Sequence, residues 1–259
     1  MSAHPLQTVP GVPRAAFWKL LLNEARLTIR QPRGLILGLA FPLLLLVVLG
    51  SSPKFRVALP SLGGLTRFDL YVPILLCFAV AAVGLWSLPS PLATYREYGI
   101  LRRLSTTPVP TTWLLAAQFA INVCIVVVSL ALLVVISTAV LGFQAHVMLS
   151  AFLLTTLISI CALFAIGILI AALAPSGQAS YLIGAAVFFP MMFFAGLWLP
   201  RAEMSQTLVD IGNYTPVAAS VQAFQTALAG AFPPAWQLLV LAGYAVVFAA
   251  LSAWLFRWE

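Results

Sequence analysis

TTWLLAAQFAINVCIVVVSLALLVVISTAVL, residues 111–141, contains no charged side chain. A helix needs about 20 predominantly apolar residues to cross the hydrocarbon core of a bilayer. The segment is therefore long enough for one crossing and too short for two. Its extra length predicts a tilted helix or one that begins in the membrane interface. This stretch indicates an α-helical membrane protein.

Charged residues are scarce in the rest of the chain as well. Of the 259 residues, 63% are hydrophobic and 7% are charged, whereas a soluble domain carries about 25% charged residues. Charges are absent from residues 34–53, 70–95, 104–200 and 211–256. With breaks at GFQAH (142–146) and APSGQ (174–178), these stretches predict an all-α, polytopic membrane protein. Its six spans are expected at about 34–52, 68–92, 111–141, 147–173, 179–199 and 233–256.

Proline and glycine mark two features of the first spans. Pro89 and Pro91 are expected to end the second span, because proline interrupts the hydrogen bonding of a helix. Gly34 and Gly38 lie about one turn apart in the first span, and small residues at this spacing let another helix approach closely. A chance spacing is the alternative explanation of the glycine pair.

The segments outside the spans are predicted from their polarity. Residues 1–13 form a tail, and residues 14–31 form an amphipathic helix in the membrane interface, with an ordinary solvated helix as the alternative. Residues 200–232 predict short extracellular helices that partly re-enter the membrane, although a seventh span over 214–231 stays open. The interfacial helix is expected to place Phe17, Leu20, Leu21 and Leu27 on one side, and Lys19, Glu24, Arg26 and Arg30 largely elsewhere.

The basic residues predict the orientation of the chain. Six spans put both termini on one side, and a cytoplasmic N-terminus places most of the arginines and lysines in the cytoplasm. The net charge of +7 is assigned to contacts with lipid headgroups rather than nucleic acid, because the basic residues flank apolar segments. Arginine outnumbers lysine and Ala, Leu and Val dominate, which indicates a GC-rich bacterial genome. The expected location of this apolar chain is therefore a bacterial inner or plasma membrane.

Motifs for covalent chemistry are missing from the sequence. It contains no P-loop, no H-E-x-x-H, no G-x-S-x-G and no pair of neighbouring carboxylates in a span. Cys77, Cys124 and Cys161 are scattered through apolar segments and have no metal-ligand spacing. We therefore expect no catalytic residue, no metal site and no cofactor in this chain. The spans also lack the charges that couple many carriers to an ion gradient, so an external energy source is implied.

Residues 93–110, ATYREYGILRRLSTTPVP, form a polar island between two spans. We expect a short surface helix at 94–108, with Leu101 and Leu104 on its apolar side and Pro108 at its end. A helix with charges of both signs suits the docking of a partner protein. Charges that merely hold this loop in the cytoplasm are the alternative.

The segment REYGILRRLSTTPVP (96–110) resembles the cytoplasmic loop of ABC type-2 transporter permeases, whose pattern is approximately R-E-x-G-T-L-E-R-L-x-x-T-P-V. It departs from that pattern at Ile100 and Arg102, and Tyr95 stands where a second acidic residue is common. PRGLILGLAFPLLLLVVLG (32–50) and MMFFAGLWLPRAEM (191–204) resemble the first span and the exit of the fifth span of the same family.

The resemblance implies a membrane subunit of an ABC exporter. Two permeases, either two copies of this chain or this chain with a sibling, pair in the membrane lipid, and two ATPase subunits that bind ATP and Mg dock beneath them. Export of drugs, antibiotics, lipids or polysaccharides is implied. The residues assigned to coupling by this resemblance are Arg96, Glu97, Gly99, Leu101, Arg102, Arg103, Leu104 and Pro108.

Aromatic and sulfur-containing side chains in the spans are candidates for the substrate route. They suit a hydrophobic or amphipathic molecule, with a drug or antibiotic favoured over a lipid. The alternative is that they face lipid or the protein core. A stand-alone secondary carrier and an integral membrane enzyme are the other functional hypotheses, and they lack coupling charges and a polar catalytic cluster, respectively. The candidate route residues are Phe78, Trp86, Tyr181, Phe188, Phe189, Met192 and Phe193.

Overall fold

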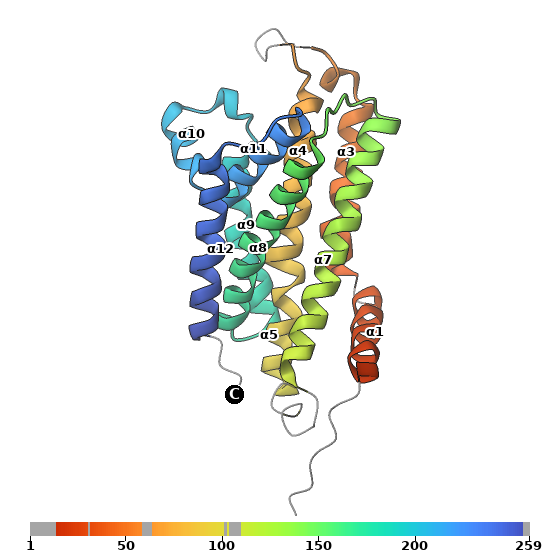
Figure 1. Cartoon of the computed structure of the whole chain (residues 1–259), viewed down its shortest axis with the longest axis vertical. Coiled ribbons are helices and arrows are strands. Elements are labelled where there is room, and N and C mark those ends of the chain that lie inside the picture. Colours follow the sequence, from red (N-terminus) through yellow and green to blue (C-terminus); the bar gives the residue numbers. More distant parts are fainter. Residues whose placement is uncertain (1–13, 31, 59–63, 101–102, 104–109, 256–259) are drawn as a thin grey trace, which may run out of the picture.

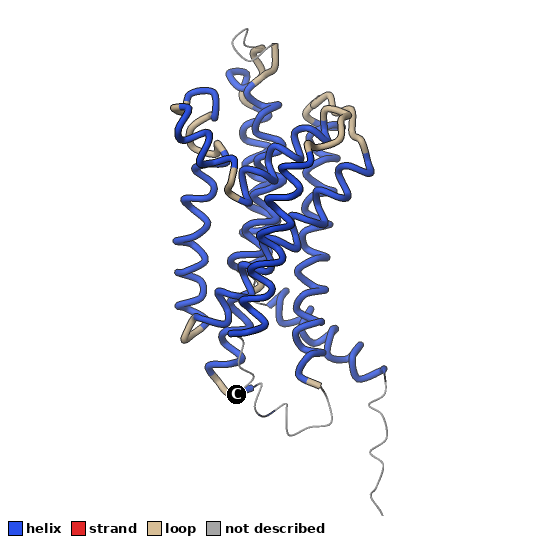
Figure 2. Tube along the Cα trace, turned by 60° about the vertical axis from the view of Figure 1, so that its left-hand side comes forward, coloured by secondary structure: helices blue, strands red, loops and turns tan. Residues whose placement is uncertain are grey.

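The chain folds into one bundle of helices that run side by side between two loop-bearing ends (Figures 1 and 2). The computed structural model describes residues 14–30, 32–58, 64–100, 103 and 110–255. Within these residues the only β-type pairing is an isolated bridge between Ala58 and Thr66. The predicted fold class, an all-α polytopic membrane protein, is confirmed.

Five helices in the described part of the chain are long and apolar enough to cross a membrane, and a shorter apolar helix, Ile36–Ser51, occupies the position of the first predicted span. Three of the spans include a π-helical segment. The first span consists of α2 (Arg33–Leu35), η1 (Ile36–Ala40) and α3 (Phe41–Ser51), and the second of α4 (Arg67–Ala82), η4 (Val83–Ser87) and α5 (Pro89–Glu97). The others are α7 (Thr111–Val135) with η5 (Ile136–Val140), α8 (Leu149–Leu173), α9 (Gly177–Ala195) and α12 (Ala235–Leu255).

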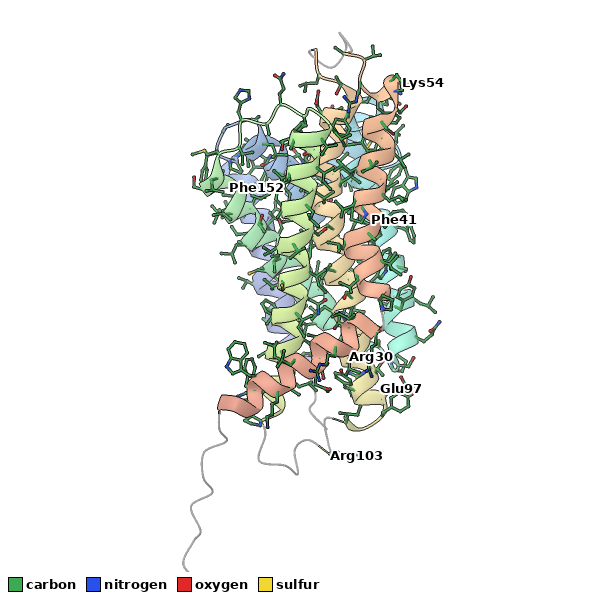
Figure 3. All side chains as sticks on the ribbon, turned by 90° about the vertical axis from the view of Figure 1, so that its right-hand side faces the viewer. Arg30, Phe41, Lys54, Glu97, Arg103 and Phe152 are labelled. Carbon is green, nitrogen blue, oxygen red and sulfur yellow. The ribbon has the colours of Figure 1, made fainter. Side chains whose placement is uncertain are left out.

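Shorter helices cover the two ends of the bundle. At one end, here called the α1 end, helix α1 (Arg14–Arg30) crosses the bundle obliquely near Glu97, as Figure 3 shows. The last described residues of α12 lie at the same end (Figure 1). The opposite end, the α10 end, carries η2 (Pro53–Phe55), η6 (Arg201–Glu203), α10 (Gln206–Asn213) and α11 (Pro216–Leu228).

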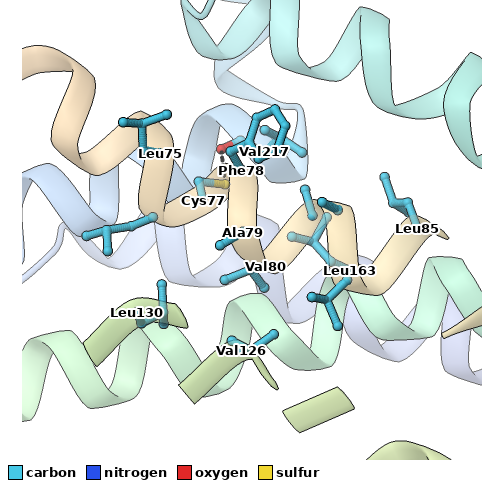
Figure 4. Packing of buried hydrophobic residues seen from close by; sticks show 14 of the residues in the cluster. Leu75, Cys77, Phe78, Ala79, Val80, Leu85, Val126, Leu130, Leu163 and Val217 are labelled. Carbon is cyan, nitrogen blue, oxygen red and sulfur yellow. Dashed lines mark hydrogen bonds between the residues drawn. The ribbon is translucent and has the colours of Figure 1, made fainter. Parts of the chain in front are cut away.

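The second span is the central, most deeply buried helix of the bundle. Every residue from Val72 to Trp86 is buried. Figure 4 shows this span packed against α7, α8 and α11, whose contributions include Val126, Leu163 and Val217. A helix that is apolar on all sides belongs in the interior of a bundle, and this one carries the largest share of the core.

The expected end of the second span at Pro89 and Pro91 is wrong, because the helix continues to Glu97. The prolines lie in the first turns of α5, directly after the π-helical segment η4, where the Leu88 N–H donates to the Val83 carbonyl over 2.9 Å. A π segment widens the helix by one residue per turn, so the proline rings enter the helix at a point where the regular hydrogen-bond ladder is already shifted. Residues 94–97, assigned to a separate surface helix, are thus the end of the second span.

Glycines allow two helices to touch the backbone of η4. A Cβ atom on Gly167 of α8 would lie 2.0 Å from the Gly84 carbonyl oxygen, and one on Gly184 of α9 would lie 2.1 Å from that of Leu85. These separations are far inside van der Waals contact, so only a residue without a side chain fits. Pro89 has no N–H to offer the Leu85 carbonyl, and the close approach of Gly184 covers this group instead.

The first span meets η4 through its own glycine pair. A Cβ on Gly34 would lie 2.2 Å from Ser87 Oγ, and one on Gly38 would lie 2.3 Å from a methyl group of Val83. The prediction that these two glycines permit the close approach of another helix is confirmed. Ser129 of α7 adds a hydrogen bond of 2.9 Å to the Gly38 carbonyl, so three spans join at this level.

The region at 200–232 forms two short helices with different environments. Helix α11 is mostly buried and packs against α4, α8, α9 and α12, while α10 is largely exposed. The Arg201 side chain ties the region together by donating to the carbonyls of Phe194 and Val209 and to Asn213 Oδ1. Partial burial lowers the pKa of Arg201 from its usual value. The segment is a folded cap on the α10 end.

Candidate functional site

An aromatic groove of about 560 Å³ lies between the first, second and fifth spans. The indole of Trp86 forms part of its wall, 4.3 Å from the ring of Phe188 and stacked at 5.9 Å on that of Tyr181. The Trp86 side chain is 6% exposed, and its Nε1 has no hydrogen-bond partner in the part of the chain described. The aromatic residues that line the groove are Phe41, Tyr71, Phe78, Trp86, Tyr181, Phe188, Phe189 and Trp198.

The structure brings together most of the predicted substrate-route residues. Phe78, Trp86, Tyr181, Phe188 and Phe189 all line the aromatic groove.

Two predicted route residues, Met192 and Phe193, line neither this groove nor the polar cavity described below. Met192 is fully buried in the core, and Phe193 packs edge-on against Phe194 at 5.6 Å. Consecutive residues of a helix point in directions about 100° apart, so one apolar run cannot place all its side chains on one face.

A second, polar cavity of about 630 Å³ adjoins the groove at the α1 end. Its walls come from α1, the start of the first span, η4, α5, α7 and α9. Glu24 of α1 is 4% exposed, and its Oε2 accepts hydrogen bonds of 2.6 Å from both Tyr95 Oη and Gln118 Nε2. Leu37, Trp86 and Tyr181 line both cavities, so the aromatic groove leads into a polar compartment.

The expected position of Glu24 on a polar side of α1 is wrong. Glu24 follows Phe17 by seven residues, Leu20 by four and Leu21 by three, and this spacing places all of them on one helical face. That face packs on α7, where the Phe17 ring lies 5.6 Å from that of Trp113. The spacing of Glu24 from Phe17, Leu20 and Leu21 could have predicted that it faces the bundle, whereas its polarity predicted the opposite.

Arg96 and Glu97, two of the predicted coupling residues, contact the turn between α8 and α9. Arg96 donates to the carbonyls of Ala172 and Ala174 at the end of α8, and Glu97 Oε2 accepts a 3.1 Å hydrogen bond from the Gly177 N–H at the start of α9. The guanidinium thus satisfies free carbonyls of one helix, and the carboxylate satisfies a free N–H of the next. The end of the second span and this turn form one connected surface.

Beyond Glu97 the chain turns away from the bundle. Tyr98 is 66% exposed, and Gly99 has a φ of +64°, a left-handed conformation that favours glycine. The Arg103 N–H donates to the Gly99 carbonyl at 3.1 Å. The remaining predicted coupling residues, Leu101, Arg102, Leu104 and Pro108, lie outside the described residues.

The fold is that of an integral membrane protein whose helices surround an aromatic groove and a polar cavity. The sequence profile of the ABC-2 type transporter matches residues 15–229, which is most of the chain. The chain belongs to this family, and it is a membrane-spanning permease subunit of an ABC transporter that is not itself catalytic. No curated protein matches the chain.

Proposed function

We propose that this chain is the permease of an ATP-driven exporter that moves hydrophobic or amphipathic molecules, a drug, an antibiotic or a lipid, out of the cell. The observation that carries the proposal is the aromatic groove. Its walls are almost entirely apolar, and its volume lies within the range of about 300–1,000 Å³ that is usual for small-molecule sites. The buried Trp86 N–H additionally suits a substrate that carries a hydrogen-bond acceptor.

The energy source in this proposal is a separate ATPase subunit, which binds ATP and Mg. Its docking surface is the α1 end, formed by the end of α5 and the α8–α9 turn that Arg96 and Glu97 hold together. Movement imposed on this surface reaches η4 along the same helix, and η4 is the segment that the first, fourth and fifth spans contact through glycines. The proposal thus connects ATPase closure with the groove wall through one continuous helix.

The functional unit in this proposal is a pair of permeases with two ATPase subunits. Phe41, Phe189 and Trp198 line the groove and are exposed on the surface of the chain. A second permease, either a copy of this chain or a sibling, covers this apolar side and excludes lipid from the route. The proposed location is a bacterial inner or plasma membrane, with the α1 end and both termini in the cytoplasm.

Purification of the tagged full chain from its own membrane tests the proposed partnership. The expected result is a complex that contains a P-loop ATPase subunit and hydrolyses ATP. A purified chain that transports an apolar probe in the absence of any ATPase and of ATP contradicts the proposal, and favours a secondary carrier instead.

A further inference from the structure

We propose that the polar cavity at the α1 end binds the protonated amine of the transported molecule, with Glu24 as its counter-charge. The inference rests on the proposed transport function and narrows its substrate class to cationic amphipathic molecules. In this arrangement the ammonium group occupies the polar cavity while the apolar part of the same molecule lies in the aromatic groove.

Glu24 is a buried carboxylate whose described hydrogen-bond partners carry no positive charge. Within the described part of the chain, its side-chain oxygen accepts hydrogen bonds from the neutral groups of Tyr95 and Gln118. Both bonds reach Oε2, so the described residues donate nothing to Oε1. A charge removed from water is costly unless an opposite charge compensates it. A cation that enters the cavity supplies that compensation.

A second acceptor lies on the same wall. Asn122 is 2% exposed, and its Oδ1 has no hydrogen-bond partner in the described part of the chain. Its Nδ2 donates to the Gln118 carbonyl over 2.8 Å, which places Asn122 one turn along α7 from the residue that holds Glu24. A buried acceptor left unpaired costs free energy. An ammonium group, which has only donors, matches a cavity that offers both a carboxylate and an amide oxygen.

The cavity and the groove together match one amphipathic molecule. Trp86 and Tyr181 line both compartments and stack with an angle of 25° between their ring planes. Aromatic faces attract cations, so the boundary between the compartments also favours a positively charged group.

Arg30 lines the polar cavity as well, but its side chain is exposed. Solvent weakens the effect of an exposed charge far more than that of a buried one. The Glu24 carboxylate therefore dominates the electrostatics of the interior of the cavity.

A direct binding measurement with two matched probes tests the inference. The full chain in lipid nanodiscs is titrated with dansylcadaverine, a naphthalene probe with a protonated primary amine, and with its uncharged N-acetyl derivative. Binding is followed by dansyl fluorescence against empty nanodiscs. A charge-assisted hydrogen bond predicts that wild type binds the amine about 10- to 100-fold more tightly. Glu24→Gln should bind the two probes alike, and Glu203→Gln, the same change at an exposed acid outside the cavity, should keep the preference.

A second variant covers the case in which Glu24→Gln does not fold. Asn122→Asp adds a carboxylate to the same wall, and it should increase the preference for the amine about tenfold. An unchanged preference in either folded variant overturns the inference. Equal affinity of wild type for both probes overturns the cation site while leaving an apolar transport route intact. Binding of neither probe overturns both the cation site and the proposed function.

Discussion

Gly167→Ala is expected to separate two of the central helices. The added Cβ would lie 2.0 Å from the Gly84 carbonyl oxygen, whereas Cβ atoms essentially never come closer than 3.0 Å to another heavy atom. Helix α8 must therefore move away from η4 by about 1 Å, since both sides of the contact are backbone and cannot rotate away. Overpacking of this kind costs ~1–3 kcal/mol.

Gly243→Ala is the matched control, because a Cβ at Gly243 in α12 meets nothing within 4 Å. Both substitutions gain the helix propensity of alanine, ~0.5–1 kcal/mol. The difference between the two variants therefore isolates the overlap at Gly167. Thermal unfolding in detergent, followed by circular dichroism, should show Gly167→Ala melting below Gly243→Ala by several degrees, since a loss of 1 kcal/mol shifts Tm by about 2–4 °C in chains of 150–250 residues. Equal melting temperatures would refute the contact between α8 and η4.

Three further predictions concern coupling, topology and assembly. Glu97→Lys removes the acceptor of the Gly177 N–H and puts a cation at the start of α9, which destabilises this contact by ~0.5–2 kcal/mol. ATP-driven transport and transport-stimulated ATP hydrolysis should fall together in Glu97→Lys, while Glu97→Gln should keep most of both activities. Normal transport by Glu97→Lys would place coupling elsewhere. Single cysteines at Gln144 and Glu203, with the native cysteines replaced, should both react with a membrane-impermeant reagent from outside the cell. If the reagent labels neither position, the predicted orientation of the chain is wrong. Active complexes should contain two permeases, and an active complex with one permease would rule out the pair.

The sequence predicted the helical bundle well because the bilayer imposes a strong constraint. Any uncharged run of sufficient length must satisfy its backbone hydrogen bonds internally, and a helix does so. The same uniform apolarity hides which face of a span is buried. Phe188, Phe189, Met192 and Phe193 are equally large and apolar in the sequence. In the structure Phe188 and Phe189 line the groove, whereas Met192 and Phe193 do not.

Features that depend on three-dimensional contacts could not be predicted from local rules. Pro89 signals the end of a helix in isolation, but the preceding π segment and the approach of Gly184 accommodate it within a continuous span. Arg96 and Glu97 carry charges typical of a docking surface, yet both side chains are hydrogen bonded to the chain's own α8–α9 turn. A partner can therefore act on these residues through the turn they organise.

ATP-driven flux through the groove is the most direct test of the proposed export function. The chain is reconstituted in inside-out vesicles with the ATPase subunit proposed as its partner. Uptake of the uncharged probe N-phenyl-1-naphthylamine is then measured for two Phe→Ala variants at equally exposed positions. Phe189 and Phe232 are each 52% exposed, but only Phe189 lines the groove. Phe189→Ala removes the apolar contact between one aromatic ring and the probe, a loss of about 1.4 kcal/mol of binding free energy. It should therefore reduce ATP-dependent uptake about tenfold, while Phe232→Ala should transport like wild type. Equal uptake by the two variants would contradict a substrate route through the aromatic groove.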